Sequence, residues 1–207
     1  MTDYETARAE LRAAELGLMQ QREEVAALRR GLPPVPAETD YVFASTNGDV
    51  RLSELLTRPD RSLVLYHFMY GKAQENPCPM CSMWADGWNA VTQHLADRLD
   101  FAVVSAAPVA DTMQLAEARG WHNLRWLSAA ENTFKTDIGG EDADGNQSPF
   151  LSVWELVEGV PHMTYSGGAH IEGEHWRGVD LLSPVWHFQD LTRQGRGDWF
   201  PSLEYTT

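Results

Sequence analysis

The chain has 207 residues, of which 43% are apolar and 8 are tryptophan, so it can bury the core of one sizeable domain. Its formal net charge of −14, from 30 acidic and 16 basic side chains, argues against nucleic acid and anionic membranes as partners. The acidic start of the chain is unlike a secretory signal, and no run approaches the roughly 20 apolar residues that cross a bilayer, so we expect a cytoplasmic protein.

Residues 4–30 predict one long amphipathic helix. Apolar side chains recur at alternating three- and four-residue spacing, and charged side chains fill the other faces. Gly31 is a suitable C-cap, and the prolines that follow it exclude continuation. The apolar stripe can pack on the domain of its own chain or form the seam of a homodimer, and the sequence leaves both open. We expect residues 1–36 to form this helix and a proline linker, and residues 37–207 to form one α/β domain.

The residues after the linker predict a short strand at 41–43 and a short helix that Ser53 caps. Residues 61–70 are nearly all apolar and rich in strand formers, which is typical of a central strand buried on both faces. A helix is expected from about Cys78 to about Arg98, because apolar residues recur there at helical spacing. This helix therefore begins one loop after a central strand.

The second half of the chain continues the alternation of strands and helices. We expect, in order, a strand at residues 101–104, a helix at 111–119, a strand at 124–127, a hairpin with arms at 150–157 and 161–166, and a helix at 179–191. This order predicts a mixed sheet with helices on both of its faces.

The two cysteines of the chain, Cys78 and Cys81, lie three residues apart in the sequence Cys-Pro-Met-Cys. At a helix N-terminus, unpaired backbone N–H groups and the helix dipole stabilise a thiolate. Pro79 suits the first helical position, where its missing N–H costs no hydrogen bond. Cys81 continues the apolar stripe that contains Trp84. The spacing therefore predicts Cys78 as an exposed nucleophile and Cys81 as a shielded resolving thiol in dithiol–disulfide exchange.

A Cys-x-x-Cys helix that follows a central strand is typical of the thioredoxin fold. Enzymes of that fold carry a cis-proline ahead of the strand that faces the dithiol, and its backbone holds the substrate chain. Pro149 stands directly before the expected hairpin, and an ordinary proline at the start of an edge strand is the alternative. Pro79 and Met80, between the cysteines, are the other expected substrate contacts.

The run from Leu65 to Tyr70, followed by Cys-Pro-Met-Cys-Ser, resembles the bacterial thioredoxin-like family called domain of unknown function 899. The resemblance also includes residues 29–33, 134–137, 162–166 and 195–196, and so covers most of the chain. Members of this family are regarded as dithiol–disulfide oxidoreductases, so the resemblance implies that activity. We accordingly expect a disulfide-containing protein or small molecule as substrate, a thiol as electron donor and no cofactor.

Two other functions are left open by the residues. The cysteine pair together with His170 and His175, at His-x₄-His spacing, could bind zinc in a protein that has a binding role. A peroxiredoxin-like peroxidase is the second alternative, although Glu75 stands where a peroxiredoxin has its threonine three residues before the nucleophile. His67 on the central strand could assist proton transfer or be a core histidine.

Overall fold

The computed structural model describes residues 2–170, 178–179 and 182–205. Its internal contacts divide the chain into two compact units, Met1–Pro34 and Val35–Thr207. Within the described residues, no helix has both the length and the apolar character needed to cross a bilayer.

The first unit consists of one helix, α1 (Asp3–Arg30), where residues 4–30 predicted it. Thr2 caps its start, because Thr2 Oγ1 accepts a hydrogen bond from the Glu5 N–H (3.2 Å) while the Glu5 carboxylate accepts one from the Thr2 N–H (2.7 Å). Gly31 ends the helix as expected. No residue of α1 is buried, and both interpretations of its apolar stripe remain predictions.

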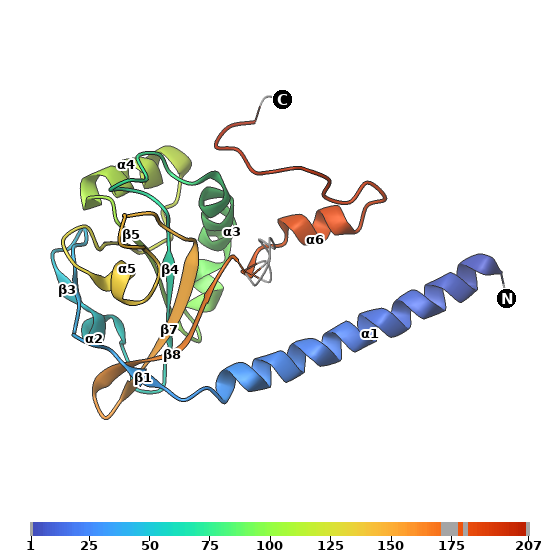
Figure 1. The fold of residues 1–207 in the computed structure, drawn as a ribbon, viewed down its shortest axis with the longest axis horizontal. Helices are drawn as coiled ribbons and strands as arrows, with labels where there is room; N and C mark the ends of the chain where they lie inside the picture. Colours follow the sequence, from blue (N-terminus) through green and yellow to red (C-terminus); the bar gives the residue numbers. More distant parts are fainter. Residues whose placement is uncertain (1, 171–177, 180–181, 206–207) are drawn as a thin grey trace. The chain divides into compact units, whose positions relative to one another are not determined.

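The second unit is built on a six-stranded sheet with the order β1-β8-β7-β4-β5-β6 (Figure 1). Its strands are β1 (Val35–Pro36), β4 (Leu63–His67), β5 (Asp100–Ser105), β6 (Trp126–Ser128), β7 (Phe150–Val157) and β8 (Val160–Gly168). Strands β4, β5 and β6 pair in parallel, whereas β7 runs antiparallel to both β4 and β8. The expected mixed sheet is confirmed.

Helices cover both faces of this sheet (Figure 1). One face packs against α3 (Pro79–Leu95), α4 (Val109–Arg119) and α6 (Val185–Asp190). The other face packs against α2 (Leu52–Leu55), α5 (Phe134–Asp137) and the small hairpin of β2 (Val42–Phe43) and β3 (Val50–Arg51). Because side chains alternate along a strand, β4 sends Tyr66 to the first core and Leu65 to the second.

Two expectations near the start of the second unit are wrong in detail. Val35 and Pro36, assigned to the linker, pair with β8 as strand β1. The N-cap of α2 is Arg51 rather than Ser53. The N–H and hydroxyl of Ser53 instead donate to the carboxylate of Asp40, at 2.9 Å and 2.7 Å, so this serine ties α2 to the preceding segment.

Other elements are shorter than expected, or were missed. The central strand ends at His67, and the chain turns at Gly71, whose φ is +93° and where a Cβ would lie 2.2 Å from the Ala107 nitrogen. Helix α6 begins only after Pro184, and residues 180–181 of the expected helix lie outside the described residues. The single turn α5 has too little periodicity for the sequence to reveal it.

Candidate dithiol site

Cys78 occupies the N-cap of α3, at the end of the loop that follows β4. Its N–H donates to the Met69 carbonyl at 3.1 Å, which holds the residue against the carboxyl end of the central strand. The Cys78 sulfur takes the place of a capping oxygen and accepts a hydrogen bond from the Cys81 N–H at 3.4 Å. Pro79 is the first residue of the helix, as predicted.

Cys81 lies one turn further along α3 and is completely buried in the core on that face of the sheet. Tyr66 from β4 and Trp84 from α3, both completely buried, belong to the same core. Cys78 is half-buried, and both cysteines are free thiols. The exposure of the two sulfurs thus differs in the direction that the spacing predicts.

The protonation of the two thiols differs in the same direction. Hydrogen bonds, first from the Cys81 thiol and then from the backbone N–H groups of Cys81 and Met80, outweigh burial and lower the pKa of Cys78 to about 7. Burial and the neighbouring Cys78 raise the pKa of Cys81 well above its ordinary value. The hydroxyl of Tyr66 and the N–H of Met69 lower this pKa, but by less. Near pH 7 this pair therefore holds one partly ionised thiol and one protonated thiol.

A cavity of about 250 Å³ opens beside Cys78. Its lining includes every residue that the sequence analysis expected to contact substrate, and these are Pro79, Met80 and Pro149. Apolar side chains make up most of the lining, which suits a neutral or apolar group next to a disulfide.

Three further residues, Met69, Gln74 and Phe200, complete the lining of this dithiol cavity and were not predicted. Met69 could have been predicted, because it lies just after the carboxyl end of the central strand, which is the end from which the chain continues to Cys78. Gln74 lies in the irregular loop before the motif. Phe200 comes from the C-terminal segment, where no local pattern indicates which surface the chain will cover.

Pro149 is not a cis-proline, because every peptide bond among the described residues is trans. It precedes β7 directly, and its carbonyl accepts a hydrogen bond from the Ala169 N–H at 2.9 Å, which extends the pairing of β7 with β8. The trans bond keeps the chain in line with that ladder. The edge-strand alternative is also wrong in part, because Pro149 precedes a strand that lies inside the sheet, between β8 and β4. This trans proline still lines the dithiol cavity.

None of the three histidines considered for proton transfer or zinc binding lines the dithiol cavity within the described residues. His67 is completely buried, with its Nε2 3.0 Å from Ser152 Oγ and its ring stacked on Phe134, so it is a core histidine. His170 is exposed, and His175 lies outside the described residues. Within the part of the chain that the structure describes, no group of three or more His, Cys, Asp or Glu side chains could hold a metal ion.

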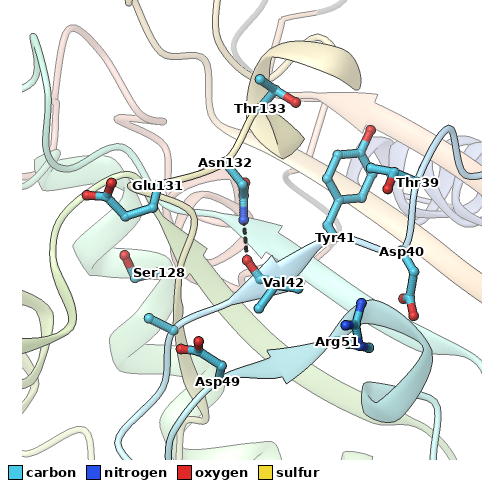
Figure 2. Close-up of a pocket in the computed structure, with 11 residues that line it drawn as sticks. Thr39, Asp40, Tyr41, Val42, Asp49, Arg51, Ser128, Glu131, Asn132 and Thr133 are labelled. Atoms are coloured by element: carbon cyan, nitrogen blue, oxygen red, sulfur yellow. Dashed lines mark hydrogen bonds between the residues drawn. The ribbon is translucent and has the colours of Figure 1, made fainter.

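Another cavity, of about 570 Å³, lies beside β2 and the segment before α5 (Figure 2). Neither cysteine lines it. Polar groups around it serve the fold: Asn132 Nδ2 donates to the Val42 carbonyl (2.6 Å), and the Tyr41 hydroxyl donates to Asp137 (2.8 Å). We therefore place the candidate chemistry in the dithiol cavity.

Comparison with solved structures identifies the architecture. Reduced Prx3 from Vibrio vulnificus superposes with a TM-score of 0.52 and 16% identity, covering 73% of this chain and 94% of that one. A cysteine-to-serine mutant of peroxiredoxin Q from Xanthomonas campestris superposes with a TM-score of 0.52 and 14% identity, covering 77% of this chain and 99% of that one. At such identities the similarity shows the fold alone, and it confirms the expected thioredoxin-like architecture.

Sequence comparison gives the family. No curated protein sequence matches the chain. A family model described as a bacterial protein of unknown function (DUF899) matches residues 1–205. That match extends over α1, the Cys-Pro-Met-Cys motif and the C-terminal segment that supplies Phe200. The chain therefore belongs to the DUF899 family of bacterial proteins, as its resemblance implied.

Proposed function

We propose that the protein is a thiol–disulfide oxidoreductase whose Cys78–Cys81 pair cycles between dithiol and disulfide. The observation that carries this proposal is the position of the Cys78 sulfur. It caps α3 at the edge of the dithiol cavity, and hydrogen bonds lower its pKa to about 7, so that a substantial fraction is thiolate at neutral pH.

The reaction has two exchange steps. In the first, the Cys78 thiolate attacks one sulfur of the substrate disulfide, a Cys78–substrate disulfide forms, and the other substrate sulfur leaves as a thiolate. In the second, Cys81 attacks the Cys78 sulfur, the Cys78–Cys81 disulfide forms, and the bond to the substrate breaks. The substrate gains two electrons and the protein loses two, which an external thiol donor must return.

Substrate contacts in this proposal come from the walls of the dithiol cavity. Pro79 and Met80 flank the nucleophile along α3, and Pro149 faces it from the start of β7. Such a lining admits either a disulfide-bonded peptide or a small neutral disulfide. We also propose the cytoplasm as its location, because thiol pools there keep a dithiol reduced.

The test uses hydroxyethyl disulfide as oxidant and a dithiol as donor. The wild-type protein is expected to turn over, and both Cys78→Ser and Cys81→Ser are expected to lose turnover by about a hundred-fold or more. Only Cys81→Ser should accumulate a mixed disulfide, which intact-protein mass spectrometry detects. A Cys78→Ser protein that retains turnover would contradict the proposal.

The two alternatives predict different results in the same preparations. A one-cysteine peroxidase would consume hydrogen peroxide rapidly even as Cys81→Ser, although Glu75 supplies no threonine hydroxyl to activate peroxide. A zinc-binding protein would carry about one zinc ion per chain and would show two thiols only after chelation. Zinc content and thiol count before and after reductant separate these cases.

A further inference from the structure

A lysine that the two exchange steps do not use is buried just beyond the carboxyl end of the central strand β4. Lys135, from α5, is 1% exposed, and its Nζ donates to the carbonyl of Phe68 at 3.0 Å and to Oε1 of Gln147. Both acceptors are neutral, and within the described residues no carboxylate lies at ion-pair distance from this ammonium. A buried cation with only neutral partners is costly, so its position calls for an explanation.

One peptide group lies between Lys135 and Cys81. The carbonyl of Phe68 accepts the hydrogen bond from Lys135 at 3.0 Å, and the N–H of the same peptide group belongs to Met69. This N–H lowers the pKa of the Cys81 thiol, so it favours a thiolate there. The Met69 carbonyl accepts the Cys78 N–H at 3.1 Å, so the same short segment also holds the start of α3. A cation on the carbonyl side polarises the group and makes its N–H a stronger donor. The amide thus couples the ammonium to the sulfur.

A second polar group, the Tyr66 hydroxyl, also affects the Cys81 thiol. The Tyr66 hydroxyl is completely buried and has no hydrogen-bond partner of ordinary geometry in the described part of the chain. Burial first, and then its interaction with Cys81, raise the pKa of Tyr66, while the same contact lowers the pKa of Cys81. The Tyr66 hydroxyl and the Met69 N–H would therefore each stabilise a negative charge on the Cys81 sulfur.

We propose that Lys135 is a positioning residue for the resolving step: through the Phe68–Met69 peptide group, its ammonium stabilises the thiolate that Cys81 must become. This inference rests on the proposed oxidoreductase function. It explains how a completely buried thiol, which ionises poorly by itself, can attack the mixed disulfide.

The step balances within the residues and substrate already named. The Cys81 thiolate attacks the Cys78 sulfur, the Cys78–Cys81 bond forms, and the bond between Cys78 and the substrate breaks. The substrate sulfur leaves with the electron pair of that bond. The proton that Cys81 gave up reaches the leaving thiolate through solvent, so the net products are the protein disulfide and a substrate thiol.

Neither Glu141 nor His67 compensates the charge of the Lys135 ammonium as a Cys81 thiolate would. Burial lowers the pKa of Lys135 to about 8, and a Cys81 thiolate opposes that shift more strongly than the carboxylate of Glu141 does. Glu141 is already paired with Lys72 at 2.8 Å. His67 stays neutral, because burial and then Lys135 lower its pKa well below the ordinary value.

One assay separates the two exchange steps. Reduced protein mixed rapidly with one equivalent of 5,5′-dithiobis(2-nitrobenzoate) releases a first coloured thiolate when Cys78 attacks and a second when Cys81 resolves the mixed disulfide. In Lys135→Met we expect an unchanged first phase and a second phase slowed about ten-fold at pH 7, which corresponds to a rise of about one unit in the pKa of Cys81. The deficit should shrink above about pH 8, where Lys135 loses its charge in the wild type.

Two further variants control for structural damage. Lys72→Met is the matched control, because it removes a neighbouring but half-exposed cation by the same substitution, and both phases should stay within about two-fold of wild type. Lys135→Gln keeps a hydrogen-bonding side chain without the charge, so it should reproduce the slow second phase even where Lys135→Met folds poorly.

The outcomes distinguish this inference from the function on which it rests. A wild-type protein that shows no first phase defeats the oxidoreductase proposal itself. A normal second phase in the Lys135 variants, or a deficit equal in both phases or independent of pH, overturns the role of Lys135 and leaves the oxidoreductase in place.

Discussion

Helices α1 and α3 begin with the same local signal and end in different surroundings. In each, the N-cap side chain accepts a hydrogen bond from the backbone N–H three residues further on, Thr2 from Glu5 at 3.2 Å and Cys78 from Cys81 at 3.4 Å. Each helix also carries an apolar stripe at three- and four-residue spacing. No residue of α1 is buried, whereas α3 buries six, namely Met80, Cys81, Ser82, Trp84, Ala85 and Trp88.

The difference shows that helical periodicity predicts an apolar face without identifying what covers it. Helix α3 is the next helix after the central strand β4 and packs on it, because Tyr66 of β4 contacts the rings of Trp84 and Trp88. The cap then decides the chemistry. A threonine hydroxyl at an N-cap stays protonated, whereas a thiol in that position becomes a nucleophile near neutral pH.

The largest expected effect comes from emptying the covered stripe. Trp84→Ala should lower the free energy of unfolding by about 3–5 kcal/mol, because Trp84 is completely buried and leaves a cavity. Leu18→Ala in α1 is the comparison, since Leu18 is 49% exposed and should cost at least about 2 kcal/mol less than Trp84→Ala. Urea unfolding measures both, and equal losses would mean that α1 is as well covered as α3.

Removing residues 1–32 tests what covers α1. Burial of five to seven of its apolar side chains, at about 25 cal/mol per Å², would stabilise the protein by several kcal/mol. We expect the shortened chain either to melt at a lower temperature or, if α1 forms the seam of a homodimer, to show half the mass by light scattering. The dithiol should react normally in both cases. Unchanged melting temperature and mass would mean that the stripe packs on nothing.

The pH dependence of alkylation tests the cap of α3. The rate of Cys78 alkylation by iodoacetamide should be half-maximal near pH 7, and at that pH about ten-fold faster than for an unperturbed thiol with a pKa of about 8.5. Cys81→Ala should move the midpoint upward, because the Cys81 thiol is the largest influence that lowers the pKa of Cys78. A wild-type midpoint near 8.5 would contradict the capping argument.

The same shift affects stability in a defined window. Between about pH 7 and about pH 8.5 the folded protein has released the Cys78 proton that the unfolded chain still holds, so Cys78 makes the reduced protein more stable as pH rises through that range. Its contribution disappears as pH falls through about 7. The raised pKa of Cys81 acts in the opposite direction above about pH 8.5.

The smallest expected effect marks where the α3 stripe ends. Val91 continues the spacing of Cys81, Trp84 and Trp88, yet it is 42% exposed. Val91→Ala should therefore change the free energy of unfolding by less than about 0.5 kcal/mol, because alanine also favours helix. A loss above about 1.5 kcal/mol in urea unfolding would show that Val91 is covered in solution.

Sequence alone determined the elements whose signals are local. The Gly31 stop, the buried run before the motif, the Gly120 cap of α4 and the hairpin turn at Glu158 and Gly159 each depend on neighbouring residues, so patterns along the chain reveal them. The roles of Cys78 and Cys81 could be predicted for the same reason. In any helix, a residue three positions after the N-cap lies about one turn further along, so the spacing of the two cysteines places one at the helix start and the other on the next turn.

Only the tertiary structure decided what surrounds the two thiols. Lys135 and Phe200 are both far from the two cysteines along the chain, and nothing in the sequence around either residue indicates that it lies near the dithiol. The trans bond before Pro149 and the exposure of Val91 were equally hidden. Each depends on which segments pack together, and that is set by the burial of the whole sheet and its helices rather than by any short run of residues.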